Sequence, residues 1–387
     1  MSETWWIKEE QLDEDQKAFA SLGPDGSHLL VGPPGSGKTN LLLLRAKYMY
    51  LAGHQNILVL VFTKTLREFI SQGSAAYELP DDVVQTMRWW QQNFLRQFGA
   101  KTEQQGDSFD EKREFMAEEV ARLVKSTKMG SIYDAIFLDE AHDYLPIEVQ
   151  TFGKLGKVIT AASDIHQKLY SGDPMDELRK LVSDEHVLRY HYRVGQKICR
   201  LADGIQKNVD GYIPLFPTCN YNETARPSSV EVFPCSSIEK QVEKILDKLD
   251  VQLKAYPDEL IGILCPRVEE LEKIWELVSS SDFAPIAMKQ GGGDHSNYDD
   301  PKRIHVGTIH SAKGVEFRAA HLASIESVRR FPYERNIVFT AITRAKTSLS
   351  LYHTKPLPGY LRQSLSSLEP LPPLPVTREL FGKQGKS

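Results

Sequence analysis

The sequence predicts an α/β protein of two domains, each built on a parallel β-sheet, and three observations support this prediction. The chain has 387 residues, which is enough for two domains with separate hydrophobic cores. Short runs rich in β-branched residues alternate with amphipathic stretches, a pattern typical of βα repetition and parallel sheets. The content of 41% hydrophobic and 26% charged residues is ordinary for a globular protein.

The expected strands fall into two series, with a change of pattern after Leu181. We therefore expect residues 1–184 to form the first domain, with a small insertion at about residues 95–130, residues 185–365 the second, and residues 366–387 a proline-rich tail. Polar loops are expected at Lys101–Arg113 and Gln290–Lys302. The expected strands are His28–Val31, Ile57–Phe62, Ala135–Asp139, Val158–Ala162, Val230–Phe233, Ile261–Cys265, His305–Thr308, His321–Ile325 and Ser348–His353.

Charge and cysteine content narrow the classes of protein. A formal net charge of −5 does not suggest a surface that is basic throughout, so contact with nucleic acid needs a local track of positive charge. No apolar run is long enough to cross a bilayer, and Met1–Glu10 does not resemble a signal peptide, so we expect a cytoplasmic protein without membrane contact. Cys199, Cys219, Cys235 and Cys265 lack metal-ligand spacing and are expected to be reduced, partly buried thiols.

A phosphate-binding loop is the most specific local pattern. Gly32–Thr39 matches every position of G-x-x-x-x-G-K-[ST], after the strand expected at His28–Val31 and before an apolar stretch at Leu41–Leu44. Its glycines let backbone N–H groups point at phosphate oxygens, and the helix N-terminus adds partial positive charge. The alternative is a glycine-rich turn that binds nothing. The residues expected to hold ATP and Mg²⁺ here are Gly32, Gly35, Ser36, Gly37, Lys38, which would reach the β- and γ-phosphates, and Thr39, a ligand of Mg²⁺.

The strand expected at Ala135–Asp139 ends in two adjacent acids, Asp139 and Glu140. At the carboxyl end of a strand, Asp139 would hold Mg²⁺. Glu140 beside it would orient or deprotonate the attacking water. Many strands end in solvated acids, so this pair gains its weight from the complete phosphate-binding loop in the same chain.

The five residues Asp139–Asp143 resemble the Asp-Glu-Ala-Gln-Asp signature of UvrD/Rep-type superfamily 1 helicases, with His142 in the position of the glutamine. Further stretches similar to motifs of that family follow in the expected order over roughly residues 10–350. The resemblance implies two RecA-like domains with the ATP site in the cleft between them. It also implies translocation on single-stranded nucleic acid, with DNA favoured over RNA, in the 3′ to 5′ direction.

The resemblance assigns roles around the nucleotide. Gln16, in a Q-motif-like stretch, would read the adenine edge, and Tyr192 would stack on adenine. Asn40 stands where the family has an arginine that stacks on adenine, which makes selectivity for adenine less secure. The stretches that resemble nucleotide-binding motifs are Leu12–Gln16, Ser163–Tyr170 (motif III), Tyr190–Arg193 (motif IV), Thr308–Phe317 (motif V) and Thr340–Lys346 (motif VI).

Five residues would act near the γ-phosphate and ribose by the same resemblance. Gln167 would sense the γ-phosphate, and Gly314 and Glu316 would meet the γ-phosphate and ribose. Arg193 and Arg344 would act as arginine fingers from the far side of the cleft, completing charge stabilisation only when the cleft closes.

The resemblance also assigns contacts with nucleic acid, and here the sequence departs from the family. Tyr170 is followed by Ser171 instead of the Trp-Arg pair that props bases apart, so the grip on the strand is expected to be weaker or arranged differently, since stacking contributes about 1–3 kcal/mol per base. Trp89 and Trp90 are the alternatives for a stacking platform, or ordinary buried aromatics. The residues expected to contact nucleic acid are Phe62, Thr63, Thr86, Tyr170, Thr308 and His310.

Three functions stay open at this point. The second large subdomain of the family would lie between Arg267 and Thr308, where only a short segment stands, so unwinding would need a partner or self-association. The first reading is a compact ATP-driven motor. The rival is an ATP-gated regulatory subunit of a nuclease or other effector, with little unwinding of its own. A small-molecule P-loop kinase would leave the similarity to motifs V and VI unexplained.

Overall fold

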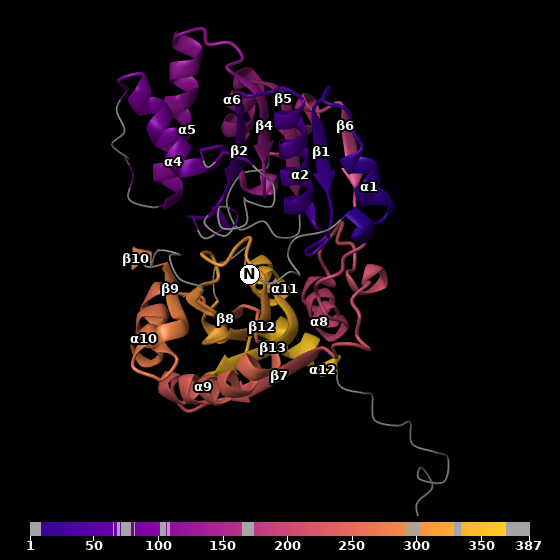
Figure 1. Ribbon diagram of the computed structural model, residues 1–387. Coiled ribbons are helices and arrows are strands. Elements are labelled where there is room, and N and C mark those ends of the chain that lie inside the picture. The colour runs from indigo at the N-terminus through magenta and orange to yellow at the C-terminus, as the bar shows by residue number, and fades with distance from the viewer. Residues whose placement is uncertain are drawn as a thin grey trace, which may run out of the picture.

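The computed structural model describes residues 9–64, 66, 67, 70, 79, 80, 82–100, 106, 109–164, 174–291, 294, 295, 302–328 and 334–368. Two parallel sheets occupy separate halves of the molecule, one above the other in the view of Figure 1, with helices around each. Among the described residues, no helix combines the length and apolar character needed to cross a membrane.

The first sheet has six strands in the order β3-β2-β4-β5-β1-β6, and all neighbours run parallel. Its strands are β1 His28–Val31, β2 Ile57–Val61, β3 Val84–Thr86, β4 Tyr133–Leu138, β5 Gly156–Ser163 and β6 Asp184–Val187. The helices of this half are η1 Glu9–Gln11, α1 Glu14–Ala20, α2 Lys38–Leu51, α4 Met87–Gln97, α5 Phe109–Ser126, η3 Ala141–Asp143, α6 Pro146–Leu155 and α7 Met175–Leu181.

The second sheet has seven strands in the order β10-β9-β11-β8-β12-β13-β7, and only the β10–β9 pair is antiparallel. Its strands are β7 Ser229–Pro234, β8 Ile261–Cys265, β9 Ala287–Gly291, β10 Asp294–His295, β11 Ile304–Thr308, β12 Phe317–Leu322 and β13 Ala345–His353. The helices are α8 Gln196–Gln206, η5 Phe216–Thr218, α9 Ile238–Ala255, α10 Val268–Ser279, η6 Ala284–Ile286, η7 Ile325–Ser327, α11 Glu334–Thr343 and α12 Gly359–Ser366.

The predicted α/β class with two parallel sheets is confirmed, and most central strands lie where the sequence placed them. The strand expected at His321–Ile325 is wrong in its bounds: β12 covers Phe317–Leu322, and Ile325 belongs to η7. All of β12 is buried, so no alternation of exposed and buried residues marked its ends. The first sheet also extends past the boundary expected at residue 184, because β6 begins at Asp184.

The loop expected at Lys101–Arg113 is wrong at its end, because α5 begins at Phe109 and contains Arg113. The Arg113 side chain is buried and pairs with Glu148 of α6, with Nη2 to Oε2 at 2.6 Å. The run of charged residues around it looks solvent-exposed in sequence, although one face of this amphipathic helix packs against α4 and α6. The expected insertion thus contains all of α5 but only the last turn of α4, the two helices drawn at the outer side of β2 in Figure 1.

Gly262 in β8 shows how closely the second sheet is packed. A Cβ atom at this position would lie 2.7 Å from the ring of Phe317, the first residue of the neighbouring strand β12. Such a distance is incompatible with ordinary van der Waals contact, so either the ring or the strand would move.

We expect Gly262→Ala to lower the free energy of unfolding by about 1–3 kcal/mol, as overpacking of a core does. Equilibrium unfolding in urea measures the change. Gly130→Ala is the matched control, because its Cβ would meet nothing within 4 Å, and it should shift stability by about 0.5 kcal/mol or less. Equal effects of the two substitutions would contradict this account of the packing.

Candidate functional site

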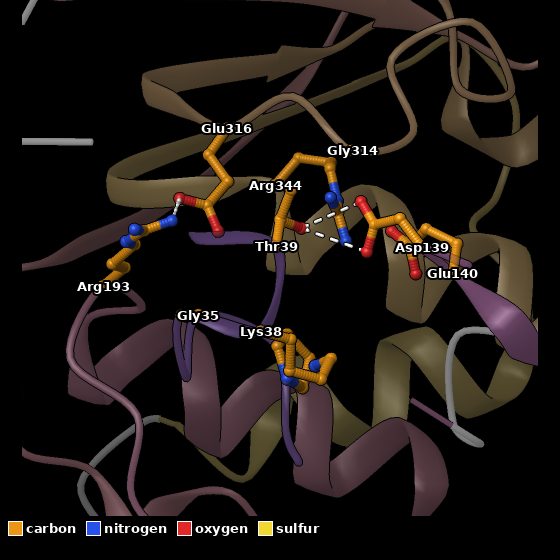
Figure 2. A pocket seen from close by; sticks show the side chains of 11 residues that line it. Gly35, Lys38, Thr39, Asp139, Glu140, Arg193, Gly314, Glu316 and Arg344 are labelled. Carbon is orange, nitrogen blue, oxygen red and sulfur yellow. Dashed lines mark hydrogen bonds and ion pairs between the residues drawn. The ribbon is translucent and has the colours of Figure 1, made fainter. Parts of the chain in front are cut away.

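One pocket collects side chains from both halves of the molecule. Figure 2 shows the phosphate-binding loop, the end of β4 and residues of the second half gathered around it. The pocket brings together most of the residues expected at the phosphates and the metal, although they are up to about 300 positions apart in the sequence. It is lined by Pro34, Gly35, Gly37, Lys38, Thr39, Asp139, Glu140, Arg193, Gly314, Glu316 and Arg344.

The phosphate-binding loop connects β1 to α2 in the conformation that its glycines permit. Gly35 and Gly37 have φ angles of 75° and 88°, a region that side-chain-bearing residues rarely adopt. Gly32 lies where a Cβ atom would come within 2.8 Å of Ser36 Oγ. Lys38 Nζ donates to the carbonyl oxygens of Gly32 and Pro33, at 2.7 and 2.9 Å, which holds its ammonium group over the loop.

Thr39 and Asp139, the two expected metal ligands, lie in direct contact. The Thr39 hydroxyl is 3.2 and 3.0 Å from the two carboxylate oxygens of Asp139. Burial, with a smaller contribution from the neighbouring Glu140, raises the pKa of Asp139 to about 7, although the bond from Thr39 opposes the shift. Hydroxyl and carboxylate oxygens are the ligands that Mg²⁺ prefers, and a divalent cation would offset the cost of burying this charge.

Glu140 occupies a strained backbone position at the end of β4. Its φ and ψ angles are 50° and 44°, in the left-handed region that few residues other than glycine adopt. Such strain costs on the order of 1–3 kcal/mol and persists where the surroundings impose it, often at functional sites. The turn directs the Glu140 carboxylate into the pocket (Figure 2) and brings Oε2 to 3.4 Å from Nε2 of His142.

Glu316 lies among three cationic side chains of the second half. Arg193 Nη1 is 3.0 Å and Lys346 Nζ 3.8 Å from Glu316 Oε2. Burial alone would raise the pKa of Glu316, but the charges of Arg193, Lys346 and Arg344 lower it to about 2. Glu316 therefore stays ionised, and it anchors the side chain of Arg193 at the edge of the pocket (Figure 2).

The residues expected to recognise adenine form a second cluster beside the loop. Asp13 caps α1 by accepting from the backbone N–H of Gln16, and it also accepts the hydroxyl proton of Tyr192. Gln16 is buried, and its side-chain amide donates to the carbonyl of Ser36 at 2.9 Å. Gln16 and Tyr192 thus lie near each other and near the loop, whereas Asn40 is buried in α2 and does not line the pocket.

A buried ion pair joins the two halves behind the pocket. Lys313 Nζ pairs with the Asp143 carboxylate, and both side chains are fully buried. The same Nζ is 3.0 Å from His142 Nε2, while His142 Nδ1 accepts from the backbone N–H of Asp164 at 2.9 Å. The Lys313 carbonyl in turn accepts from the Thr63 hydroxyl at 3.0 Å.

Some of the residues expected to contact nucleic acid have structural partners here. The guanidinium of Arg113 covers one face of the Phe62 ring, 5.0 Å from its centroid. The Thr63 hydroxyl is engaged with Lys313, and the Thr86 hydroxyl caps α4 by accepting from the Trp89 N–H at 3.3 Å. The bond to Lys313 places Thr63 at the junction of the halves, and none of these contacts shows strand-binding geometry by itself.

Two further members of that set, Thr308 and His310, have described positions. Thr308 and His310 lie at and just after the end of β11, where the Thr308 hydroxyl accepts from the Ser311 N–H at 3.1 Å. Gln167 and Tyr170 lie outside the described residues. Of the two tryptophans, Trp90 is buried and donates to the Tyr133 hydroxyl at 3.0 Å, so it is a core residue, while Trp89 is exposed.

Three contributors to the site were not singled out in the sequence. Lys313 and Lys346 lie inside stretches that resemble motifs, but no expectation was attached to them, and Asp13 reads as an ordinary helix cap. Their importance comes from partners that are distant in sequence, namely Asp143, Glu316 and Tyr192. A buried lysine within an apolar stretch would have been the only local signal.

Two comparisons found proteins to which part of this chain is similar. A family model described as the UvrD-like helicase C-terminal domain matches residues 303–352, which run from the start of β11 to near the end of β13. A solved structure, titled the C-terminal domain of a possible DNA helicase from Lactobacillus plantarum WCFS1, is 21% identical with a TM-score of 0.33. It covers 46% of this chain and 96% of its own. No curated protein matches the chain.

The buried ion pair gives a prediction about stability. Lys313→Met leaves the Asp143 carboxylate buried without its partner, so we expect the free energy of unfolding to fall by about 3–5 kcal/mol. Urea unfolding measures it. Lys240→Met is the control, because Lys240 and Glu243 form an exposed pair whose loss should change stability little.

A double variant separates the effect of the lost ion pair on stability from the effect of lost lysine packing. Asp143→Asn combined with Lys313→Met removes the uncompensated charge and should restore part of the lost stability. A Lys313→Met variant as stable as Lys240→Met would show that the pair does not hold the halves together.

Proposed function

We propose that this chain is an ATP-driven motor similar to superfamily 1 helicases, with two RecA-like domains that hydrolyse ATP–Mg²⁺ on single-stranded DNA. The observation that carries the proposal is the composition of the pocket. Lys38, Thr39, Asp139 and Glu140 enter it from the first half, and Arg193 and Arg344 from the second. Opposite halves thus supply complementary parts of one hydrolytic site, as expected if turnover depends on closure of the cleft.

The residues around the metal position suit Mg²⁺. Thr39 and Asp139 would be its protein ligands, and the ion would neutralise charge on the phosphate oxygens during transfer. Lys38 would bind the β- and γ-phosphates, and the backbone N–H groups of the loop would bind the remaining oxygens. Gln16 and Tyr192 would complete the adenine end.

Glu140 has the position of the general base. Its carboxylate would take a proton from water as the water oxygen bonds to the γ-phosphorus and the bond to ADP breaks. Arg193 and Arg344 would stabilise the charge that spreads over the γ-phosphoryl oxygens. Glu316, which holds Arg193 at the pocket edge, would position that guanidinium for the step.

Motion of the halves would couple this chemistry to nucleic acid. The Thr63–Lys313–Asp143 contacts connect the end of β2 and η3 with the segment between β11 and β12, directly behind the pocket. Changes in the cleft would therefore reach Thr63 and Phe62 through a short chain of buried contacts. By family resemblance, repeated closure would move the strand 3′ to 5′.

Two contacts made by residues of the first half favour the rival function. Arg113 covers a face of the Phe62 ring, and the Thr63 hydroxyl donates to the Lys313 carbonyl. Two of the residues expected to contact single-stranded DNA are therefore engaged with the protein itself. An ATP-gated regulatory subunit of a nuclease or other effector would use the same pocket and the same closure, without a grip on single-stranded DNA.

Steady-state ATPase measurements with and without single-stranded DNA, single-stranded RNA and duplex DNA, at two salt concentrations, test the proposal. A motor should be stimulated most by single-stranded DNA, and less at higher salt, because phosphate contacts release counterions. Lys38→Ala is the control for contaminating ATPase. Turnover without stimulation by any nucleic acid would favour the regulatory subunit, and no turnover with wild-type protein would refute the motor.

We expect Glu140→Gln to keep ATP–Mg²⁺ affinity and to lose nearly all turnover, because the amide cannot accept the proton from water. Equilibrium binding of a fluorescent ATP analogue and steady-state ATPase assays measure the two properties. The binding result serves as the control for folding. Near wild-type turnover in this variant would assign the base to another residue.

Arg344→Ala should reduce kcat by about 10³-fold or more while leaving nucleotide affinity almost unchanged, as loss of an arginine finger does. Arg362→Ala, at an exposed position of α12, is the matched control and should leave kcat unchanged. An effect of Arg344→Ala on affinity alone would contradict a role in the transition state.

A further inference from the structure

Three side chains able to bind a metal ion meet in the second half of the molecule. His191, Cys199 and Cys219 each place one donor atom within 4.8 Å of the other two. His191 follows β6, Cys199 lies in α8, and Cys219 follows η5, so the fold brings together residues without metal-ligand spacing in the sequence.

The histidine of this cluster is fully buried. Its Nε2 lies 2.9 Å from the carbonyl oxygen of Leu215, which can only accept, so Nε2 carries the proton in the neutral ring. Nδ1 has no hydrogen-bond partner among the described residues. A buried nitrogen without a partner is costly and calls for an explanation, and a bound ion is one that suits imidazole.

The two thiols converge on one acceptor beside the histidine. Cys199 Sγ and Cys219 Sγ donate to the carbonyl oxygen of Val194, at 3.4 and 3.3 Å, and Cys199 Sγ is 3.8 Å from His191 Nε2. Thiolate is the form that binds metals.

We propose that His191, Cys199 and Cys219 bind one Zn²⁺, with water as the fourth ligand. Zn²⁺ takes sulfur at about 2.3 Å and nitrogen at about 2.0–2.1 Å, so tetrahedral donors lie roughly 3.6–3.8 Å apart. His191 would ligate through Nδ1, because Nε2 keeps its proton and its bond to the Leu215 carbonyl. The donor atoms of the three residues lie within 4.8 Å of one another, so ligation requires contraction by about an ångström at most. Binding would release the thiol protons, which leaves the Val194 carbonyl to accept from the zinc-bound water.

The proposed zinc site would hold a segment of the chain that also reaches the pocket. His191 and Cys219 form an isolated parallel bridge, and Asn220 N–H donates to the His191 carbonyl at 2.9 Å. Arg193 follows two residues after His191, and Tyr192 N–H donates to the carbonyl of Gly35 at 3.3 Å. A zinc ion would therefore fix the segment that carries Arg193 to the edge of the pocket.

Titration of reduced, metal-free protein with Co²⁺ in the absence of oxygen tests the site directly. One Co²⁺ per chain should bind with sulfur-to-cobalt charge-transfer absorption in the near ultraviolet and the visible bands of tetrahedral cobalt, and one Zn²⁺ should displace it. No nucleotide is present, so the result is independent of the proposed ATPase function. Absence of these bands, or of saturable binding by Zn²⁺, would overturn the proposal.

Substitutions locate the ligands. Cys199→Ser and Cys219→Ser should each weaken Zn²⁺ binding by more than about 100-fold, since even changes to the outer partners of metal ligands cost 10- to 100-fold. Cys235→Ser and Cys265→Ser are the matched controls and should bind as wild type does. Circular dichroism checks the folding of each variant, and a folded Cys219→Ser protein with wild-type affinity would refute the assignment.

A measurement on the unaltered chain covers the case in which a variant fails to fold. Zn²⁺ should raise the Tm of wild-type protein, and above the Kd the rise should continue with the logarithm of the free Zn²⁺ concentration. Peptide mass spectrometry of the air-oxidised protein then tests the alternative that Cys199 and Cys219 form a redox-active disulfide. A Cys199–Cys219 disulfide that forms equally with and without Zn²⁺ would overturn the metal site in favour of a redox pair.

Discussion

The Lys313–Asp143 ion pair lies fully buried at the junction of the two halves, and the arrangement of the pocket depends on it. A charge taken out of water is tolerated only where its partner is held in place, so this pair ties the segment between β11 and β12 to η3. Gly314 and Glu316 follow Lys313, and Glu140 and His142 precede Asp143. The pair therefore sets the distance across which the two sets of pocket residues face each other.

The remaining charges of the site are arranged by the same principle. Glu316 is buried with Arg193 and Lys346 on one side of the pocket, and Asp139 is buried with Thr39 on the other. The first acid is ionised because cations surround it, whereas the pKa of the second is raised to about 7 because none of its contacts fully compensates its burial. The pocket thus has one acid, Glu316, whose charge is compensated by neighbouring cations. The other acid, Asp139, carries a charge that a divalent cation would stabilise.

Sequence alone predicted the parts of this structure that depend on local pattern. The loop Gly32–Thr39 and the strand before Asp139 follow from spacing and apolar runs, and both lie at the pocket. Contacts between distant segments were not predictable, because neither the burial of Arg113 nor the meeting of Cys199 with Cys219 leaves a periodic signal. Short edge strands such as β6 were missed for a related reason: Asp184–Val187 is mostly exposed and polar, and pairing with β1 alone makes it a strand.

The left-handed backbone at Glu140 predicts which residues selection for stability would favour at this position. A residue with φ of 50° is held there against its own preference, and glycine or asparagine would occupy the turn with less strain. Laboratory evolution that rewards heat resistance alone would therefore tend to discard this carboxylate. Retention of glutamate at this position among variants chosen only for survival of the fold would indicate that the side chain also contributes to stability, through His142.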